Sequence, residues 1–239
     1  AIGFVTQLFF IVVIVANAIG IGTSAMVSRA VGASDIGRAA EIGRQSLIFG
    51  AAVAVGITAV TILCCGRIVA LAGMPGPIQA VAEDFLRIFA FALGPNYFLI
   101  IVNAVFRAAG DVRKPLLTMF FVSLVNITGD FALAFGIPPF PAMGYRGIAC
   151  STASSFAVGM LISLALLASR RWRRVFAGPW RVNIPTIARI VDIGWPSAFL
   201  QVAWQAGTIV LYSILSRLGE GTVTALAALT NGLRIEAII

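Results

Sequence analysis

Long runs of uncharged, mostly apolar residues are the feature that most restricts how this chain can fold. A helix that crosses the hydrocarbon core of a bilayer needs about 20 such residues. Six runs reach that length and a seventh is shorter: 1–28, 45–66, 88–106, 115–145, 147–169 and 193–216, then 221–233. Charged residues make up 11% of the 239, against about 25% in soluble domains, so we predict an integral, multi-pass membrane protein.

The runs predict helices and not strands. Helices and closed β-barrels are the two structures that satisfy every backbone polar group in lipid, and the strands of a barrel alternate apolar and polar residues over about 10 positions. The runs in this chain are longer and do not alternate. We therefore expect an all-α fold, a polytopic bundle of transmembrane helices, with one helix over residues 115–136 inside the fourth run.

Basic residues lie between the runs and indicate the orientation. Counted over successive loops, Arg and Lys contribute twelve residues to alternate loops and four to the others. The loops with the excess are expected in the cytoplasm, so the first run enters from the outside. The 170–192 connection, with Arg170-Arg-Trp-Arg-Arg174, is then a cytoplasmic interfacial anchor or, alternatively, a contact for lipid headgroups.

The composition argues against several classes of function. The chain has no histidine, which is the commonest metal ligand and the side chain that titrates near neutral pH. Cys64, Cys65 and Cys150 lack the spacing of a zinc site and are expected to pack inside the bundle. We therefore expect no resident metal, no cofactor and no enzyme activity. The basic residues behind the formal charge of +8 lie between the spans and not on one solvated face, so no nucleic-acid partner is expected. A channel is also not expected, because it would need a repeated filter-like loop and the sequence has none.

The ends of the sequence predict flanking spans. The chain starts at Ala1 inside one apolar run and stops at Ile239 inside another. Residues 225–231 align with residues 1–7 at an offset of 224, either by chance or because six-helix units repeat in parallel, as in some transporters. We expect one span before this chain and about four after it, in a protein of about 12 spans and roughly 450 residues.

Asp130 is the one charged residue inside the fourth run. At 1.5 Å per residue it lies roughly 22 Å along the helix, in the outer half of a core of ~30 Å. Asn126 is one turn earlier and shares its face. A carboxylate at this depth is unfavourable and marks a functional site by default. We predict that Asp130 exchanges a proton with the outside or binds Na⁺ together with Asn126; the alternative is a structural hydrogen bond to a neighbouring helix.

Other polar residues in the runs are candidates for the same site or for a substrate cavity. Thr152 begins the next run and joins Asp130 if the two helices pack antiparallel, although its hydroxyl can instead bond within its own helix. Amides in lipid need partners, so each faces a neighbouring helix or a cavity. The amides assigned to a possible substrate cavity are Gln7, Asn17, Asn103, Gln201 and Gln205.

Five ordered segments resemble the multidrug and toxin extrusion (MATE) family. No single segment is specific, but their order and spacing hold over essentially the whole chain. The segments are Gly20-Ile-Gly-Thr-Ser-Ala-Met-Val-Ser-Arg-Ala-Val-Gly-Ala33, Arg107-Ala-Ala-Gly-Asp-Val-Arg-Lys-Pro115, Asn126-Ile-Thr-Gly-Asp130, Met143-Gly-Tyr-Arg-Gly-Ile-Ala149 with Ser151-Thr152, and Ile193-Gly-Trp-Pro196.

The resemblance implies a two-lobe transporter of 12 helices, of which this chain, truncated at both ends, would hold helices two to eight. Residues 1–169 would form the first lobe, 170–192 a cytoplasmic linker and 193–239 the start of the second lobe. The resemblance also implies export of amphipathic, often cationic compounds or drugs in exchange for H⁺ or Na⁺, with a coupling role for Asp130 and Asn126 beside Thr152. We expect a monomer in a bacterial or archaeal plasma membrane.

A lipid or lipid-linked oligosaccharide flippase of the same superfamily is the nearest alternative. Its cavity should be more cationic, to meet a pyrophosphate, whereas the spans here carry almost no Arg or Lys. The chain also departs from the family pattern, because Trp204 and Gln205 stand where some relatives have a glutamate. That departure weakens a cation site in the second lobe. Substrate identity and the choice of coupling ion are left open.

Overall fold

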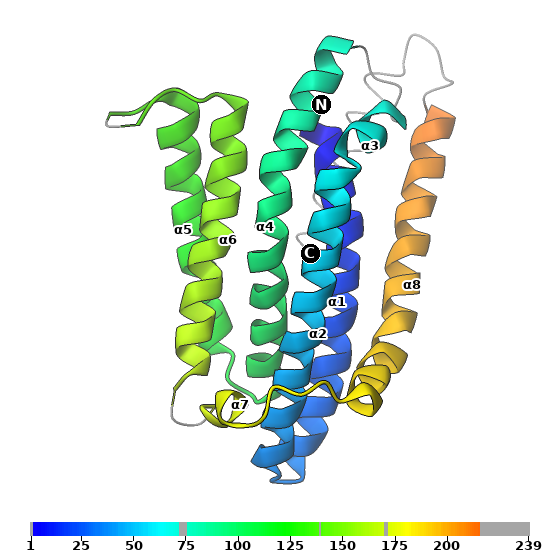
Figure 1. Ribbon diagram of the computed structural model, residues 1–239, viewed down its shortest axis with the longest axis vertical. Coiled ribbons are helices and arrows are strands. Elements are labelled where there is room, and N and C mark those ends of the chain that lie inside the picture. Colours follow the sequence, from blue (N-terminus) through cyan, green and yellow to red (C-terminus); the bar gives the residue numbers. More distant parts are fainter. Residues whose placement is uncertain (1, 72–75, 139, 170–171, 216–239) are drawn as a thin grey trace. The chain divides into compact units, whose positions relative to one another are not determined.

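The computed structural model describes residues 2–71, 76–138, 140–169 and 172–215, with side chains over 9–70, 79–138, 140–169 and 172–207. Within these ranges the secondary structure is helical throughout and contains no strand, which confirms the all-α prediction. The helices are α1 (Ile2–Gly32), α2 (Ile36–Leu63), α3 (Cys65–Leu71), α4 (Gly76–Ala108), α5 (Arg113–Phe135), α6 (Tyr145–Leu167), α7 (Arg174–Ala177) and α8 (Ile184–Leu215) (Figure 1).

Five of the described helices are long and apolar enough to cross a membrane: α1, α2, α4, α5 and α6. They correspond to the first five predicted runs. The sixth predicted run, 193–216, lies largely in α8, whose side chains are described only as far as residue 207, so this run stays a prediction. The seventh run and the similarity at residues 225–231 lie outside the described residues.

Local sequence signals fix where the helices begin and end. Asp35 caps α2, since its side-chain oxygen accepts a hydrogen bond from the backbone N–H of Arg38 at 2.8 Å. The helix α5 ends at Phe135 and is capped by Gly136, whose φ of 72° lies in the left-handed region that glycine adopts without a steric penalty. The helix predicted over 115–136 is therefore confirmed to within two residues.

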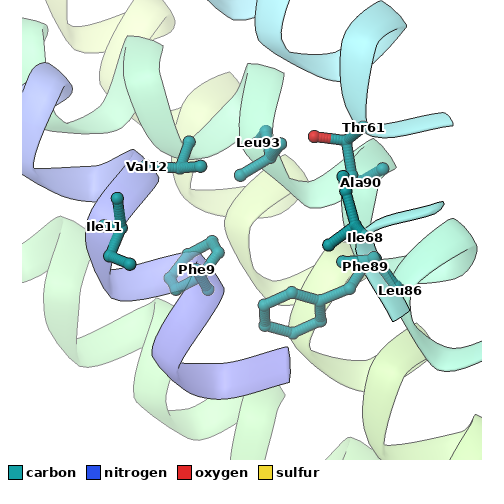
Figure 2. Close-up of a pocket in the computed structure, with 9 residues that line it drawn as sticks. All are labelled: Phe9, Ile11, Val12, Thr61, Ile68, Leu86, Phe89, Ala90 and Leu93. Carbon is teal, nitrogen blue, oxygen red and sulfur yellow. The ribbon is translucent and has the colours of Figure 1, made fainter. Parts of the chain in front are cut away.

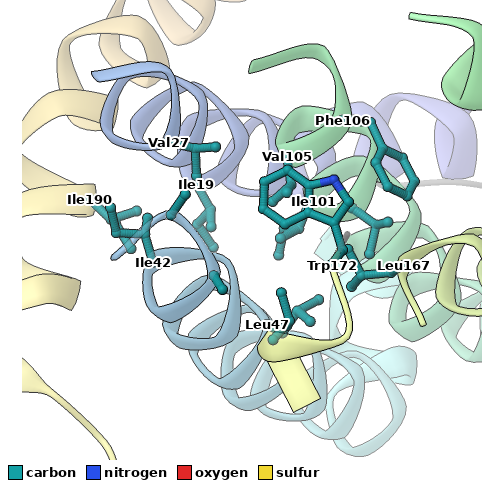
Figure 3. Packing of buried hydrophobic residues seen from close by; sticks show 14 of the residues in the cluster. Ile19, Val27, Ile42, Leu47, Ile101, Val105, Phe106, Leu167, Trp172 and Ile190 are labelled. Atoms are coloured by element: carbon teal, nitrogen blue, oxygen red, sulfur yellow. The ribbon is translucent and has the colours of Figure 1, made fainter. Parts of the chain in front are cut away.

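The described helices belong to two compact units, residues 1–196 and 197 onward, divided within α8. In the first unit α5 packs on α6, α4 packs on α6, α1 and α2, and α1 packs on α2. The main apolar cluster joins α1, α2 and α4 to the linker and to the start of α8, and Figure 3 shows Trp172 and Ile190 within it. Both of these side chains are completely buried.

The segment between α6 and α8 is held against α2 by polar contacts as well. The Gln45 amide donates a hydrogen bond to the Arg181 carbonyl at 2.7 Å and accepts one from the Asn183 N–H at 2.9 Å. The buried Arg44 guanidinium lies against Gly178, where a Cβ atom would collide with it. The linker therefore has a fixed path across the end of α2. The predicted lobe and linker boundaries at 169, 170–192 and 193 stay predictions.

Candidate functional site

The candidate site lies on the packed pair α5 and α6, and the close approach of these helices comes from small residues. Gly147, Ser151, Ser155, Gly159 and Ser163 recur every fourth residue on α6 and are all buried. A Cβ atom built on Gly147 would lie 2.5 Å from the Leu133 carbonyl oxygen of α5. Small residues at this spacing let helix backbones approach closely in membranes. We call these five residues the α6 seam.

Two hydrogen bonds cross from α5 to α6 at the level of Asn126. The Ser151 hydroxyl donates to the Asn126 carbonyl oxygen at 2.9 Å, and the Asn126 side-chain amide donates to the Thr152 hydroxyl oxygen at 3.5 Å. Thr152 in turn donates to the Ile148 carbonyl of its own helix at 3.0 Å. The structure therefore brings Asn126 and Thr152 together as the antiparallel packing of the two helices requires, and Ser151 is an additional member.

Asp130 follows Asn126 by one helical turn and is half-buried. Its Oδ1 atom is buried and has no hydrogen-bond partner among the described residues. The backbone beside it is tightly packed, because a Cβ atom on Gly129 would lie 2.6 Å from the Ser151 hydroxyl oxygen. A buried acceptor without a donor is unfavourable, and native proteins leave few such atoms. The oxygen is thus available to a proton or cation.

The chemistry of the three predicted residues defines what a site here can do. The Asp130 carboxylate, the Asn126 amide oxygen and the Thr152 hydroxyl oxygen are oxygen ligands of the kind that hard cations prefer. Protonation of the carboxylate would instead make it a hydrogen-bond donor. Among the described residues, no group of three or more His, Cys, Asp or Glu side chains lies close enough to hold a metal ion. The coupling roles of Asp130, Asn126 and Thr152 stay predictions.

The five residues predicted to line a substrate cavity differ from one another in burial and in hydrogen bonding. Asn103 is completely buried in α4, and its Nδ2 and Oδ1 atoms have no partner among the described residues. Asn17 is half-buried. In the second unit the Gln201 amide bonds the Ser197 carbonyl at 3.5 Å, and Gln205 is half-buried. The side chain of Gln7 lies outside the described ones. The cavity assignment of these five stays a prediction.

An apolar cavity of about 120 Å³ lies between α1, α2, α3 and α4 (Figure 2). Phe9 and Phe89 meet edge to face at its wall, with ring centroids 4.8 Å apart. Thr61 is the only polar lining residue among the nine: Phe9, Ile11, Val12, Thr61, Ile68, Leu86, Phe89, Ala90 and Leu93. This cavity was not predicted, because its lining residues come from four separate helices and carry no common periodic signal. The α6 seam was also missed, although its four-residue spacing is visible in the sequence.

At its first turn, α6 is tied to α4. The Tyr145 hydroxyl donates to Asp84 Oδ2 at 3.1 Å, and Arg146 forms an ion pair with the same carboxylate. The first turn of α6 is thereby fixed to α4. The position of Ser151 and Thr152, which follow in the next turns, is set by this anchor and by the seam.

The comparisons with known proteins agree with this geometry. The MatE family profile matches residues 1–132, more than half of the chain. The chain belongs to this family. The MatE match covers α1 to α4 and most of α5, including Asn126 and Asp130. It confirms the resemblance drawn from the five sequence segments.

Relatives of this MatE chain include several bacterial proteins. It is 25% identical over 237 residues to a probable multidrug resistance protein NorM of Thermotoga maritima, covering 99% of the chain and 50% of that protein. It is 22% identical over 241 residues to an FAD transporter of Shewanella oneidensis, covering 52% of it. The chain spans about half the length of the curated relatives it matches.

Solved structures show the same fold. A MOP superfamily transporter from Pyrococcus furiosus superposes with a TM-score of 0.85 at 24% identity, over 99% of this chain and 51% of that one. An outward-facing and an inward-facing multidrug resistance MATE transporter superpose with TM-scores of 0.82 and 0.77, each at 22% identity and 52% of its length. The MATE-like helical architecture is therefore confirmed.

Proposed function

We propose that the complete protein is a secondary active transporter that exports amphipathic, cationic organic compounds in exchange for H⁺ or Na⁺. Asp130 holds the coupling ion, with Asn126 and Thr152 beside it. The observation that carries the proposal is the buried Oδ1 atom of Asp130, which has no partner among the described residues and lies inside a membrane-spanning helix. An ionisable group inside a membrane span is energetically unfavourable, and such groups commonly bind ions or substrates.

Ion binding at Asp130 would act on the packing of α5 against α6. When the carboxylate is ionised, the helix pair must keep it near water, a cation or a cationic substrate. A bound proton or Na⁺ neutralises it, and the dry, closely packed arrangement becomes more favourable. Because the α6 seam leaves no room for added atoms, small shifts must be taken up by repacking. Ion and substrate then weaken each other's binding equally, by linkage, and entry of the ion from outside drives substrate release.

The charge distribution of the described spans supports a neutral or cationic substrate. Arg107, Arg113 and Arg146 lie near helix ends. The two basic residues set deeper in the described spans, Arg44 in α2 and Arg87 in α4, are on different helices, and Arg87 is paired with Glu83, so these spans carry no cationic cluster of the kind that a pyrophosphate needs. A flippase for lipids or lipid-linked oligosaccharides remains the alternative. The FAD transporter among the relatives adds an anionic nucleotide to the compounds that should be tested.

The test is efflux from proteoliposomes that hold the purified full-length protein, with a pH gradient or a Na⁺ gradient imposed separately. A fluorescent lipophilic cation and FAD are loaded in parallel. We expect the lipophilic cation to be exported under one of the two gradients. Asp130→Asn should abolish gradient-driven export while the protein still inserts and remains monodisperse, because asparagine keeps the size and loses the charge.

Asp192→Asn is the matched control, since Asp192 is an exposed carboxylate on α8. It should export at the wild-type rate. Undiminished export by Asp130→Asn would overturn the coupling role, and export of FAD without the lipophilic cation would overturn the cationic substrate class. We also propose that the protein is a monomer in a bacterial or archaeal plasma membrane. The protein mass of the purified particle, corrected for bound detergent, would test the first statement, and membrane fractionation would test the second.

A further inference from the structure

A cavity of about 330 Å³ lies at the turn between α1 and α2, where the start of α8 reaches it. Arg29 at the end of α1, Arg38 in the first turn of α2 and Arg189 in α8 all line it. The α1–α2 turn and the start of α8 lie at the same end of the bundle in Figure 1. The consecutive helices α1 and α2 and the start of α8, which is distant in sequence, therefore bring three arginines to one cavity.

These three arginines have no ion pair among the described residues. Elsewhere in the described chain Arg87, Lys114 and Arg146 each pair with a carboxylate. The carboxylate that lines this cavity is Asp35, and its Oδ1 atom accepts the capping hydrogen bond from the Arg38 backbone. A second carboxylate, Glu41, lines an adjoining cavity of about 630 Å³ that shares Asp35, Arg38 and Arg189 with this one, so three arginines face two carboxylates. The cavity therefore carries an excess of positive charge.

The backbone that holds the arginines is rigidly packed. Each arginine is next in sequence to a completely or almost completely buried residue, Ala30, Ala39 and Ile190 respectively. The Ile190 carbonyl lies so close to Gly22 that a Cβ atom there would collide with it. Like charges held close together are unfavourable unless an anion compensates them. The fold thus fixes the backbone positions from which the three exposed arginine side chains line this space, and the space suits an anion.

We propose that this cavity binds the phosphate group of an anionic membrane lipid. Arginine forms paired, charge-assisted hydrogen bonds with phosphate oxygens. The rest of the lining is mostly apolar, with Met26, Ala30, Ile42 and Ile193, which suits the glycerol and the first carbons of the acyl chains. The predicted cytoplasmic side of the bundle faces the leaflet rich in anionic lipids, and basic pockets between helices on that side bind such headgroups.

The site is separate from Asp130 and does not depend on the export function. Asp130 lies near the end of α5, whereas the cavity uses α1, α2 and α8. The lipid would hold the start of α8 to the α1–α2 turn beside the linker. Loss of the lipid would then lower stability without removing the coupling ion.

The experiment is native mass spectrometry of the full-length protein, purified in neutral detergent and titrated with phosphatidylglycerol, phosphatidylcholine or inorganic phosphate. We expect phosphatidylglycerol to bind with a stoichiometry of one at the lowest concentrations, and phosphatidylcholine to bind more weakly. Each single change, Arg29→Gln, Arg38→Gln or Arg189→Gln, should weaken phosphatidylglycerol binding about fivefold. The triple variant should lose tenfold or more.

The matched control removes three arginines from the same predicted face but outside the cavity: Arg107→Gln, Arg113→Gln and Arg174→Gln together. It should bind phosphatidylglycerol as the wild type does. Asp35→Asn keeps an oxygen that can cap α2 and removes the negative charge that lines the cavity, so it should tighten binding a few-fold. Equal losses in both triple variants, or equal binding of the two lipids, would overturn the site. If inorganic phosphate binds as tightly as phosphatidylglycerol, the cavity is a site for free phosphate and the proposal of a lipid ligand is overturned.

Discussion

Replacing Gly147 by alanine tests both the α5–α6 packing and the site that depends on it. The added Cβ atom would lie 2.5 Å from the Leu133 carbonyl oxygen, 2.6 Å from its carbonyl carbon and 2.9 Å from the Ala134 nitrogen. All three are backbone atoms, so no side chain can rotate away. The helices must separate by about 0.5–1 Å for the contact to become an ordinary one, and overpacking of this kind costs about 1–3 kcal/mol.

The same separation would break the contact between Asn126 and Thr152. That hydrogen bond is already at 3.5 Å, where hydrogen bonds are weak, and a further 0.5 Å removes it. The Gly147→Ala protein should therefore lose coupling as well as stability. Thermal unfolding of the detergent-solubilised protein measures the first effect. With about 2–4 °C per kcal/mol for a chain of this size, we expect an apparent midpoint lower by roughly 2–12 °C.

Gly56→Ala supplies the control, because a Cβ atom at Gly56 meets nothing within 4 Å. Alanine stabilises an exposed helix position by up to about 1 kcal/mol relative to glycine. The control should be as stable as the wild type or slightly more stable. If Gly147→Ala has the same midpoint as Gly56→Ala, the close packing of α5 and α6 described here is wrong.

Two further predictions concern the linker and the cysteines. Gln45→Leu removes both hydrogen bonds to the linker, so hydrogen exchange of the Asn183 backbone amide should accelerate at least tenfold. Gln45→Glu keeps an acceptor for that N–H and should accelerate the exchange less. Equal exchange in both variants would contradict the role of Gln45. Burial, with a smaller contribution from Glu83, raises the pKa of the Cys65 thiol. At pH 7–8 alkylation of Cys65 should therefore be slower than alkylation of the less buried Cys64, and it should increase only as the pH rises through the raised pKa. Faster labelling of Cys65 than of Cys64 at neutral pH would contradict this prediction.

The sequence predicted the membrane helices because their signal is local. An uncharged run of about 20 residues that does not alternate is stable in lipid as a helix, and α5, Arg113–Phe135, lies close to the helix expected over residues 115–136. The beginning of α2 was predicted too late, at residue 45 and not at Ile36. The first turns of that helix carry Glu41 and Arg44, whose side chains contact the linker, so a search for uncharged residues stops short of them.

The candidate site was predicted in part for the same reason. Asp130 and Asn126 are one turn apart in one helix, so their common face follows from helix geometry alone. The approach of Thr152 depends on the packing of two helices, and the sequence indicated it only if they are antiparallel. The role of Gln45 could not be predicted, because its partners are backbone atoms 136 and 138 residues away. The convergence of Arg29, Arg38 and Arg189 likewise requires the tertiary structure.

The most direct test of the account is whether substrate releases the coupling ion from Asp130. The purified full-length protein in weakly buffered detergent solution, equilibrated with either H⁺ or Na⁺, is mixed with a fluorescent lipophilic cation, and the ion released per bound cation is measured. We predict release of one ion per cation from the wild type and from Asp192→Asn, and none from Asp130→Asn. Equal release from Asp130→Asn and the wild type would show that the coupling ion binds elsewhere.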